Sequence, residues 1–172
     1  MSSFQDWHIK ERVSRIARAY QRAGHPVDLR PYTFEIDFGN LLAGASTPMP
    51  QIVSIPAEAD FVWLGTSLFP HFEQGNAGGA PERPLSYFVR ITLHKSFGTL
   101  GRHIRAAGDG DAEWIPLANI AGSGREPFFW PFPIISAGGD KIAWDAANLR
   151  NNAQTIRVTM HGVQLYRRLA VA

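Results

Sequence analysis

Residues 125–167 constrain the fold of this chain more than any other stretch. An aromatic segment with three prolines is followed by a Gly-Gly turn, a second segment of strand length, an Asn-rich turn and a long closing segment. Such turns separate antiparallel strands, and proline inside a strand confines it to a sheet edge or a bulge. We therefore expect the end of a β-sandwich, in which residues 127–133 form an edge strand or a broken one.

The closing segment, residues 155–166, alternates between two faces. Its apolar face comprises Ile156, Val158 and Met160. The Thr, Arg and His residues between them suit the opposite, polar face. We expect Gly162 to mark a β-bulge, after which Val163 and Leu165 swap faces.

Earlier parts of the chain add short strands of the same kind. Residues 32–38 show the clearest period of two, with aromatic and aliphatic residues on one face and Thr, Glu and Asp on the other. The other expected strands are residues 51–55, 60–64, 85–95, 102–106, 113–117 and 141–146. Because strands do not alternate with helices, we predict a mainly β protein, a single antiparallel β-sandwich of jelly-roll-like form.

Residues 3–23 precede the strands and predict an amphipathic helix. Its apolar stripe comprises Ile9, Val13, Ile16 and Tyr20, at spacings of three and four. Gly24 and Pro26 end the helix. Residues 1–30 carry six bases and three acids, whereas the remainder carries 11 bases and 12 acids. We therefore divide the chain into an N-terminal helical arm, residues 1–28, and a β-sandwich domain, residues 29–172.

Three positions for this helix stay open. It packs on its own domain, as most helices do. Alternatively, it docks on a neighbouring subunit or another acidic surface, or it contacts nucleic acid or a membrane, which a single basic helix supports only weakly. The irregular residues 69–84 suit an exposed tip or a contact between subunits.

The search for chemistry yields no catalytic residue, no metal site and no cofactor. Cysteine is absent, which excludes disulfides, zinc-thiolate sites and a Cys nucleophile. Ser123 lacks the surroundings of a hydrolase nucleophile. The remaining metal candidates are a weak calcium motif at residues 109–113 and a meeting of His94 with His161. No apolar run reaches the roughly 18 residues of a membrane span, and the N-terminus does not predict a signal peptide.

The last 45 or so residues resemble the C-terminal halves of small virion structural proteins of tailed bacteriophages. In that pattern a Pro-rich apolar strand leads to a turn, a strand ending in Asn-Leu, and a final strand with a His-Gly pair. The matching residues are Pro131, Phe132, Pro133, Gly138, Gly139, Asp145, Asn148, Leu149, Val158, Thr159, His161, Gly162 and Tyr166.

The resemblance implies a head-decoration (cement) protein on the capsid surface. Its partners would be the major capsid protein and copies of itself, as in a homotrimer, and neither a membrane nor nucleic acid is expected as a partner. In this hypothesis the basic helix and the aromatic segment bury surface between neighbouring subunits. The expected partner-binding residues are Trp7, Arg12, Arg15, Ile16, Arg18, Tyr20, Phe128, Phe129, Trp130 and Phe132.

Two rival functions remain. A tail, collar or head–tail connector component would use the same sandwich against other surfaces. A carbohydrate-binding module or a small sandwich enzyme would need a cleft with aromatic platforms, for which the candidates are Trp63, Trp114 and Trp144.

Overall fold

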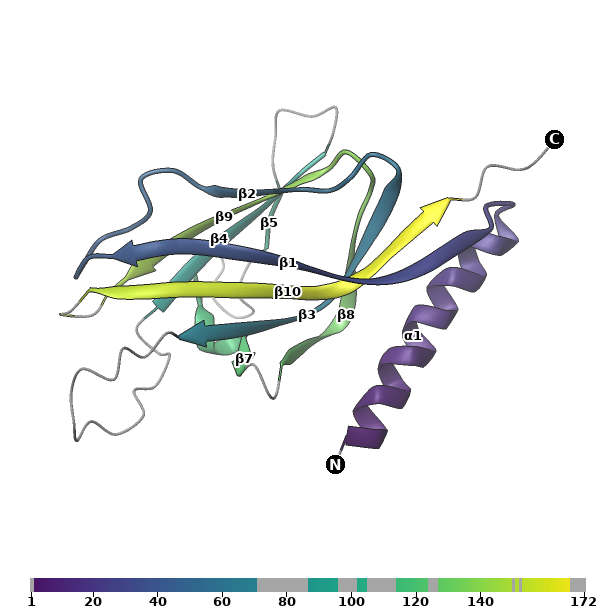
Figure 1. The fold of residues 1–172 in the computed structure, drawn as a ribbon, viewed down its shortest axis with the longest axis horizontal. Coiled ribbons are helices and arrows are strands. Elements are labelled where there is room, and N and C mark those ends of the chain that lie inside the picture. Colours follow the sequence, from purple (N-terminus) through teal and green to yellow (C-terminus); the bar gives the residue numbers. More distant parts are fainter. Residues whose placement is uncertain are drawn as a thin grey trace.

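The computed structural model describes residues 2–70, 87–95, 102–104, 114–123, 127–149, 151 and 153–167. Within these ranges the chain forms two packed β-sheets, with helix α1 (Ser2–Arg22) beyond one end of them (Figure 1). The strands are β1 (Val27–Leu41), β2 (Gln51–Ser54), β3 (Ala59–Pro70), β4 (Tyr87–His94), β5 (Arg102–Ile104), β6 (Ile115–Pro116), β7 (Gly122–Ser123), β8 (Phe128–Ser136), β9 (Lys141–Asn148) and β10 (Gln154–Arg167), with a 3-10 turn at Leu117–Asn119.

Strand pairing identifies the sandwich as a jelly roll. The first sheet has the order β1-β10-β3, with β8 and the short β7 on the far side of β3; the second has the order β2-β9-β4-β5, with β6 also beside β4. The antiparallel pairs β1–β10, β2–β9, β3–β8 and β4–β5 are nested along the sequence, from the two ends of the chain towards its middle. This nesting is the topology of a jelly roll. The predicted fold class is confirmed, with the two-residue parallel pairing of β7 with β3 as a local exception.

The main core lies between the two sheets. Period-two alternation places Ile36, Trp63 and Met160 of the first sheet against Val89 and Trp144 of the second, and all of them are buried. The rings of Trp63 and Trp144 lie 5.5 Å apart between centroids. Aromatic side chains of this size bury roughly 150–250 Å² each, so this pair fills the centre of the sandwich.

The bulge expected at Gly162 is present, but the extra residue lies on β3. His161 pairs with Gly65 and Gly162 pairs with Trp63, while the pairing of β10 with β1 continues without a shift. A Cβ on Gly162 would overlap the carbonyl oxygen of Val62, so the close approach requires glycine. The predicted change of face along β10 is wrong, because its own alternation is unbroken.

Val163 and Leu165 therefore stay on the outer face of the first sheet, where α1 buries them. The predicted stripe of α1 packs there as expected, with Val13 and Ala17 buried and Ile9, Ile16 and Tyr20 partly buried. On the sheet side the contact is made by Val27, Val62, Leu64 and Leu165. The helix thus lies on its own sandwich, the first of the three positions considered above.

The strand boundaries differ from the predicted ones mainly in length. β1 begins at Val27, so the expected division at residue 28 falls at the start of a strand. β3 runs to Pro70 and takes in the first two residues of the expected loop 69–84; residues 71–84 lie outside the described part of the chain. Gly24, with φ of +79°, ends α1 as predicted, since its N–H bonds to Gln21 O at 3.0 Å.

β8 is both an edge strand and a broken one, as its prolines predicted. Among the described residues it pairs with β3 alone, through Phe128–Phe129 at one end and Ile134–Ser136 at the other. No pairing is formed between these two parts, where the register jumps from Gly65 to Trp63 on β3. Residues 130–133 therefore form a wide bulge at the edge of the first sheet.

Candidate interaction surface

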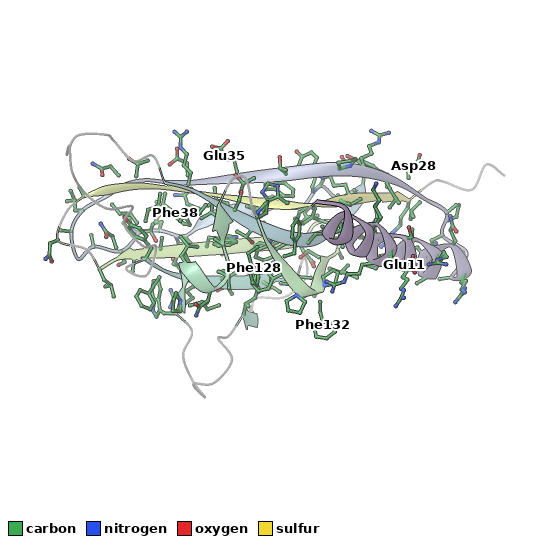
Figure 2. All side chains as sticks on the ribbon, turned by 90° about the horizontal axis from the view of Figure 1, so that it is seen from below. Glu11, Asp28, Glu35, Phe38, Phe128 and Phe132 are labelled. Atoms are coloured by element: carbon green, nitrogen blue, oxygen red, sulfur yellow. The ribbon has the colours of Figure 1, made fainter. Side chains whose placement is uncertain are left out.

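The four aromatic side chains of β8 are divided between interior and solvent. Trp130 packs inward, edge-on to Trp63 at 5.1 Å and to Phe128 at 5.3 Å between ring centroids. Phe129 joins the apolar cluster under α1. Phe132, at the tip of the bulge, is 84% exposed. Figure 2 shows Phe132 projecting from the sandwich, on the opposite side of that view from Glu35 of β1.

A hydrogen bond from α1 braces the base of this bulge. The Arg12 guanidinium donates to the carbonyl oxygen of Trp130 at 2.9 Å. A carbonyl in a bulge has lost its ladder partner, and leaving it unpaired in a partly buried place would be costly. The basic helix and the aromatic segment, two separate candidates in the sequence, therefore meet in one place.

A buried carboxylate fixes the other end of α1. Asp60, at the start of β3, accepts hydrogen bonds from Tyr20 Oη at 2.8 Å, from Gly138 N at 2.9 Å and from Arg167 at 3.0 Å. Burial acts to raise the pKa of Asp60, but the bonds from Gly138, Tyr20 and Arg167 outweigh it and hold this pKa below its ordinary value. Burial, followed by the bond to Asp60, raises the pKa of Tyr20 to about 12. The helix, a turn and the last strand are joined at this one group, which we name the Asp60 latch.

The solvent face of α1 carries most of its bases. Lys10, Arg15, Arg18 and Arg22 are exposed there. Glu11 Oε1 accepts from Arg15 at 3.0 Å and from Arg18 at 3.1 Å, while those two side chains remain 74% and 54% exposed. Among the described side chains of α1, Glu11 is the one acid that pairs with these bases, and exposed ion pairs of this kind contribute little to stability. The face remains strongly positive.

The opposite edge of the first sheet, strand β1, also presents apolar groups. Leu29 and Tyr32 are 42% and 41% exposed. Exposed apolar residues also gather at the end of the sandwich away from α1, where Leu42 precedes β2 and Leu149 follows β9. The Asn148 amide holds these two turns together by donating to Leu41 O at 3.0 Å and to Leu42 O at 3.2 Å.

The structure sorts nine of the ten expected partner-binding residues into three groups. Ile16, Tyr20, Phe129 and Trp130 pack within the chain. Arg12 is engaged with the bulge and Phe128 is half-buried, while Arg15, Arg18 and Phe132 remain accessible. The side chain of Trp7 lies outside the described residues.

Sequence reasoning missed the exposed groups on β1 and at the far end. The alternation of residues 32–38 placed Tyr32 on the buried face, and the alternation itself is correct. The end of β1 extends past the second sheet, however, so that face has no cover there (Figure 1). The alternation of residues within a strand does not indicate where the strands of one sheet extend beyond those of the other.

The candidates for chemistry and for sugar binding are placed as follows. His161 Nε2 lies 2.7 Å from Ser67 Oγ on the first sheet, whereas His94 lies on the second; burial lowers the pKa of His161. Trp63 and Trp144 are fully buried and so offer no platform to a sugar, while Arg90 covers the half-buried Trp114 ring at 5.3 Å. Residues 109–113, the calcium candidate, lie outside the described residues.

Within the described part of the chain no three His, Asp or Glu side chains gather as metal ligands would. Among the same residues α1 does not have the apolar length that a membrane-spanning helix requires.

Comparison with known proteins yields little. No protein-family model matches the chain, and no curated protein sequence matches it. One solved structure, from turnip yellow mosaic virus, is similar at 10% sequence identity with a TM-score of 0.34, over 86% of this chain and 97% of that one. Similarity at this level shows no family, and the fold assignment rests on the strand pairing described above.

Proposed function

We propose that this protein is a non-enzymatic structural component of a virus particle. In its most specific form the proposal is a head-decoration protein, which binds the major capsid protein and its own copies on the capsid surface and stabilises the head. The observation that carries the proposal is the presence of exposed apolar side chains at both lateral edges of a jelly roll. These are Leu29 and Tyr32 on β1, and Phe132 and Ile135 on β8.

Two opposite apolar edges suit a protein that sits between neighbours. A subunit that bridges others needs at least two separate contact surfaces, and heterologous contacts of this kind build rings and shells. Leu29, Tyr32, Phe132 and Ile135 are each more than 40% exposed and so are available for such contacts. Since β1 and β8 lie at opposite edges of one sheet, each edge can meet a different neighbour.

The fold is compatible with this role without establishing it. Jelly rolls occur in viral capsid proteins, and also in lectin domains and cupins, and a fold does not by itself define a function. A lectin role has less support here, because two of its three candidate platforms are core residues. The resemblance of residues 131–166 to phage virion proteins favours the particle.

The residues of that resemblance have structural positions. Pro131 and Pro133 flank Phe132 within the bulge. In the β8–β9 turn, Gly138 leaves no room for a Cβ against Ala57 O. Asn148 joins the two turns at the far end of the sandwich. The residues of the resemblance therefore shape the edges and the ends of the sandwich. In the proposed role, these are the parts of the protein that contact its neighbours.

The direct test is binding to purified particles. The full-length protein is mixed with tail-free heads and, separately, with isolated tails from particles that lack it, and each mixture is sedimented. We expect saturable binding to heads and a higher temperature of head disruption in its presence, because a ligand of the assembled state stabilises that state. Binding to tails alone would support the tail, collar or connector alternative, and binding to neither would reject the proposal.

A further inference from the structure

We propose that the solvent face of α1 and the Phe132 ring form one docking surface, the arm–knob surface, for an acidic protein surface around an apolar pocket. The surface comprises Arg15, Arg18, Arg22 and Phe132. This inference rests on the proposed function, in which the acidic surface belongs to the capsid protein. It goes further by stating which side of the molecule docks and what chemistry receives it.

The two parts of the arm–knob surface are continuous. Arg12 joins them, because it lies on α1 and donates to Trp130 O, two residues before Phe132. Glu11, which precedes Arg12 in the helix, forms ion pairs with Arg15 and Arg18. Figure 2 shows Glu11 and Phe132 in the same half of the view. A partner that receives Phe132 therefore also faces the bases of the helix.

The knob is rigid before it binds. Pro131 and Pro133 restrict the backbone on both sides of Phe132. Trp130 is anchored in the core against Trp63, and β8 lies so close to β3 that a Cβ on Gly65 would overlap Phe128 O. An exposed ring that is already held in position loses little conformational entropy on binding, which favours affinity. A single rigid aromatic group with a charged rim is a common arrangement of binding hot spots.

The charge of the surface defines the partner. From residue 15 to residue 22 a helix rises about 10 Å, and at about 100° per residue Arg15, Arg18 and Arg22 lie within about 60° of one another around its axis, so three bases line a strip of that length. Among the described residues Glu11 is the one acid with which the exposed bases of α1 form ion pairs. Carboxylates on a partner would complement this strip, which gives orientation and a fast association rate.

A protein partner fits better than a nucleic acid. Glu11 lies among the bases and would face phosphates at close range, opposing a contact that depends on phosphate neutralisation. The knob also requires a matching pocket, which a folded protein surface supplies. Duplex DNA binding is therefore an alternative outcome of the test.

The experiment uses point variants of the full chain, because removing α1 would uncover Val62, Leu64 and Leu165. Purified heads that lack the protein are titrated with wild type, with Phe132→Ala and with the double variant Arg15→Glu/Arg22→Glu. We expect roughly 30-fold weaker binding for Phe132→Ala. For the double variant we expect at least about tenfold weaker binding and a reduced dependence on salt.

Matched controls lie elsewhere on the molecule. Met49→Ala removes an apolar side chain that is 73% exposed from the β1–β2 connection, and Lys141→Glu reverses an exposed base on β9 of the other sheet. Both are expected to bind heads within about twofold of wild type, since substitutions outside an interface change little. Melting temperatures of all variants confirm that each is folded.

The outcomes separate this inference from the function on which it rests. Heads that bind wild type and both arm–knob variants equally would overturn the inference and leave the proposed function standing. Heads that do not bind wild type would contradict both. If the double variant loses affinity for a 30-base-pair DNA duplex and not for heads, the basic strip serves nucleic acid, and the inference is likewise overturned.

Discussion

The two apolar layers of this protein differ in how they are held together. The layer between the sheets is large, draws on both sheets and is centred on Trp63 and Trp144. The layer under α1 is small, comprises one helix against one sheet face, and has the Asp60 latch at its edge. The comparison indicates that the sandwich is the folding unit, and that α1 is an added layer whose docking can be weakened separately.

The largest effect is expected from the inter-sheet layer. Trp63→Ala should lower the free energy of unfolding by about 3–5 kcal/mol, because it leaves a cavity at the centre and removes the bond from Trp63 Nε1 to Gly65 O. Urea denaturation measures the change. A loss below about 1 kcal/mol would mean that this pair is not the centre of the core.

A smaller loss is expected from the layer under the helix. Leu165→Ala should cost about 2–3 kcal/mol, since Leu165 is fully buried but belongs to the smaller cluster. Hydrogen exchange should show the amides of α1 losing protection while those of β9 keep theirs. Equal loss of protection in both would show that the two layers unfold as one.

Both acid and alkali should weaken the docking of α1 at the Asp60 latch. The pKa of Asp60 is lowered in the folded protein, so its contribution to docking is present above pH ~4, the ordinary pKa of Asp, and is lost as the pH falls through the folded value. The pKa of Tyr20 is raised to about 12, so its contribution is present below pH ~10 and is lost as the pH rises through about 12.

The chemical shifts of α1, measured between pH 7 and pH 3, would follow the protonation of Asp60. We expect them to move together with those of Val62 in the wild type, and to depend less on pH in Asp60→Asn. A helix whose shifts respond to acid identically in both proteins would exclude Asp60 as the latch.

Removal of one latch contact should have a modest effect. Tyr20→Phe deletes the hydroxyl that donates to Asp60 and should cost about 1–2 kcal/mol, measured by thermal or urea unfolding. The matched control is Tyr32→Phe, at an exposed tyrosine of β1, which should be neutral within about 0.5 kcal/mol. Indistinguishable values for the two variants would contradict the latch.

The smallest effect on stability is expected at the knob. Phe132→Ala should change the free energy of unfolding by less than about 0.5 kcal/mol, because the ring is exposed and packs on little. A chemical denaturation curve that overlays the wild-type curve is the expected result. A loss above about 1.5 kcal/mol would assign Phe132 to folding and not to docking.

The fold class could be predicted from the sequence because alternation and turn composition are local signals. The strand order could not, since β1 and β10 pair across more than a hundred residues without any local mark of the partner. Residues 60–64 did contain a further signal. A strand that is apolar on both faces needs cover on both, and Val62 and Leu64 indeed lie under α1 while Trp63 faces the other sheet.

The candidate surface was predicted only in part. The basic face of α1 follows from helical spacing, and Arg15 and Arg18 are exposed as expected. The sorting of the β8 aromatics depends on where the bulge begins, which prolines permit but do not specify. The bond between Arg12 and Trp130 joins residues 118 positions apart, and the sequence carries no sign of it.

The most direct test of the central claim is a density map of the intact particle. We predict jelly-roll density of this protein on the capsid surface in many copies, with the side formed by α1 and Phe132 against the major capsid protein. Density confined to the tail or collar, or heads that lack the protein altogether, would contradict the account.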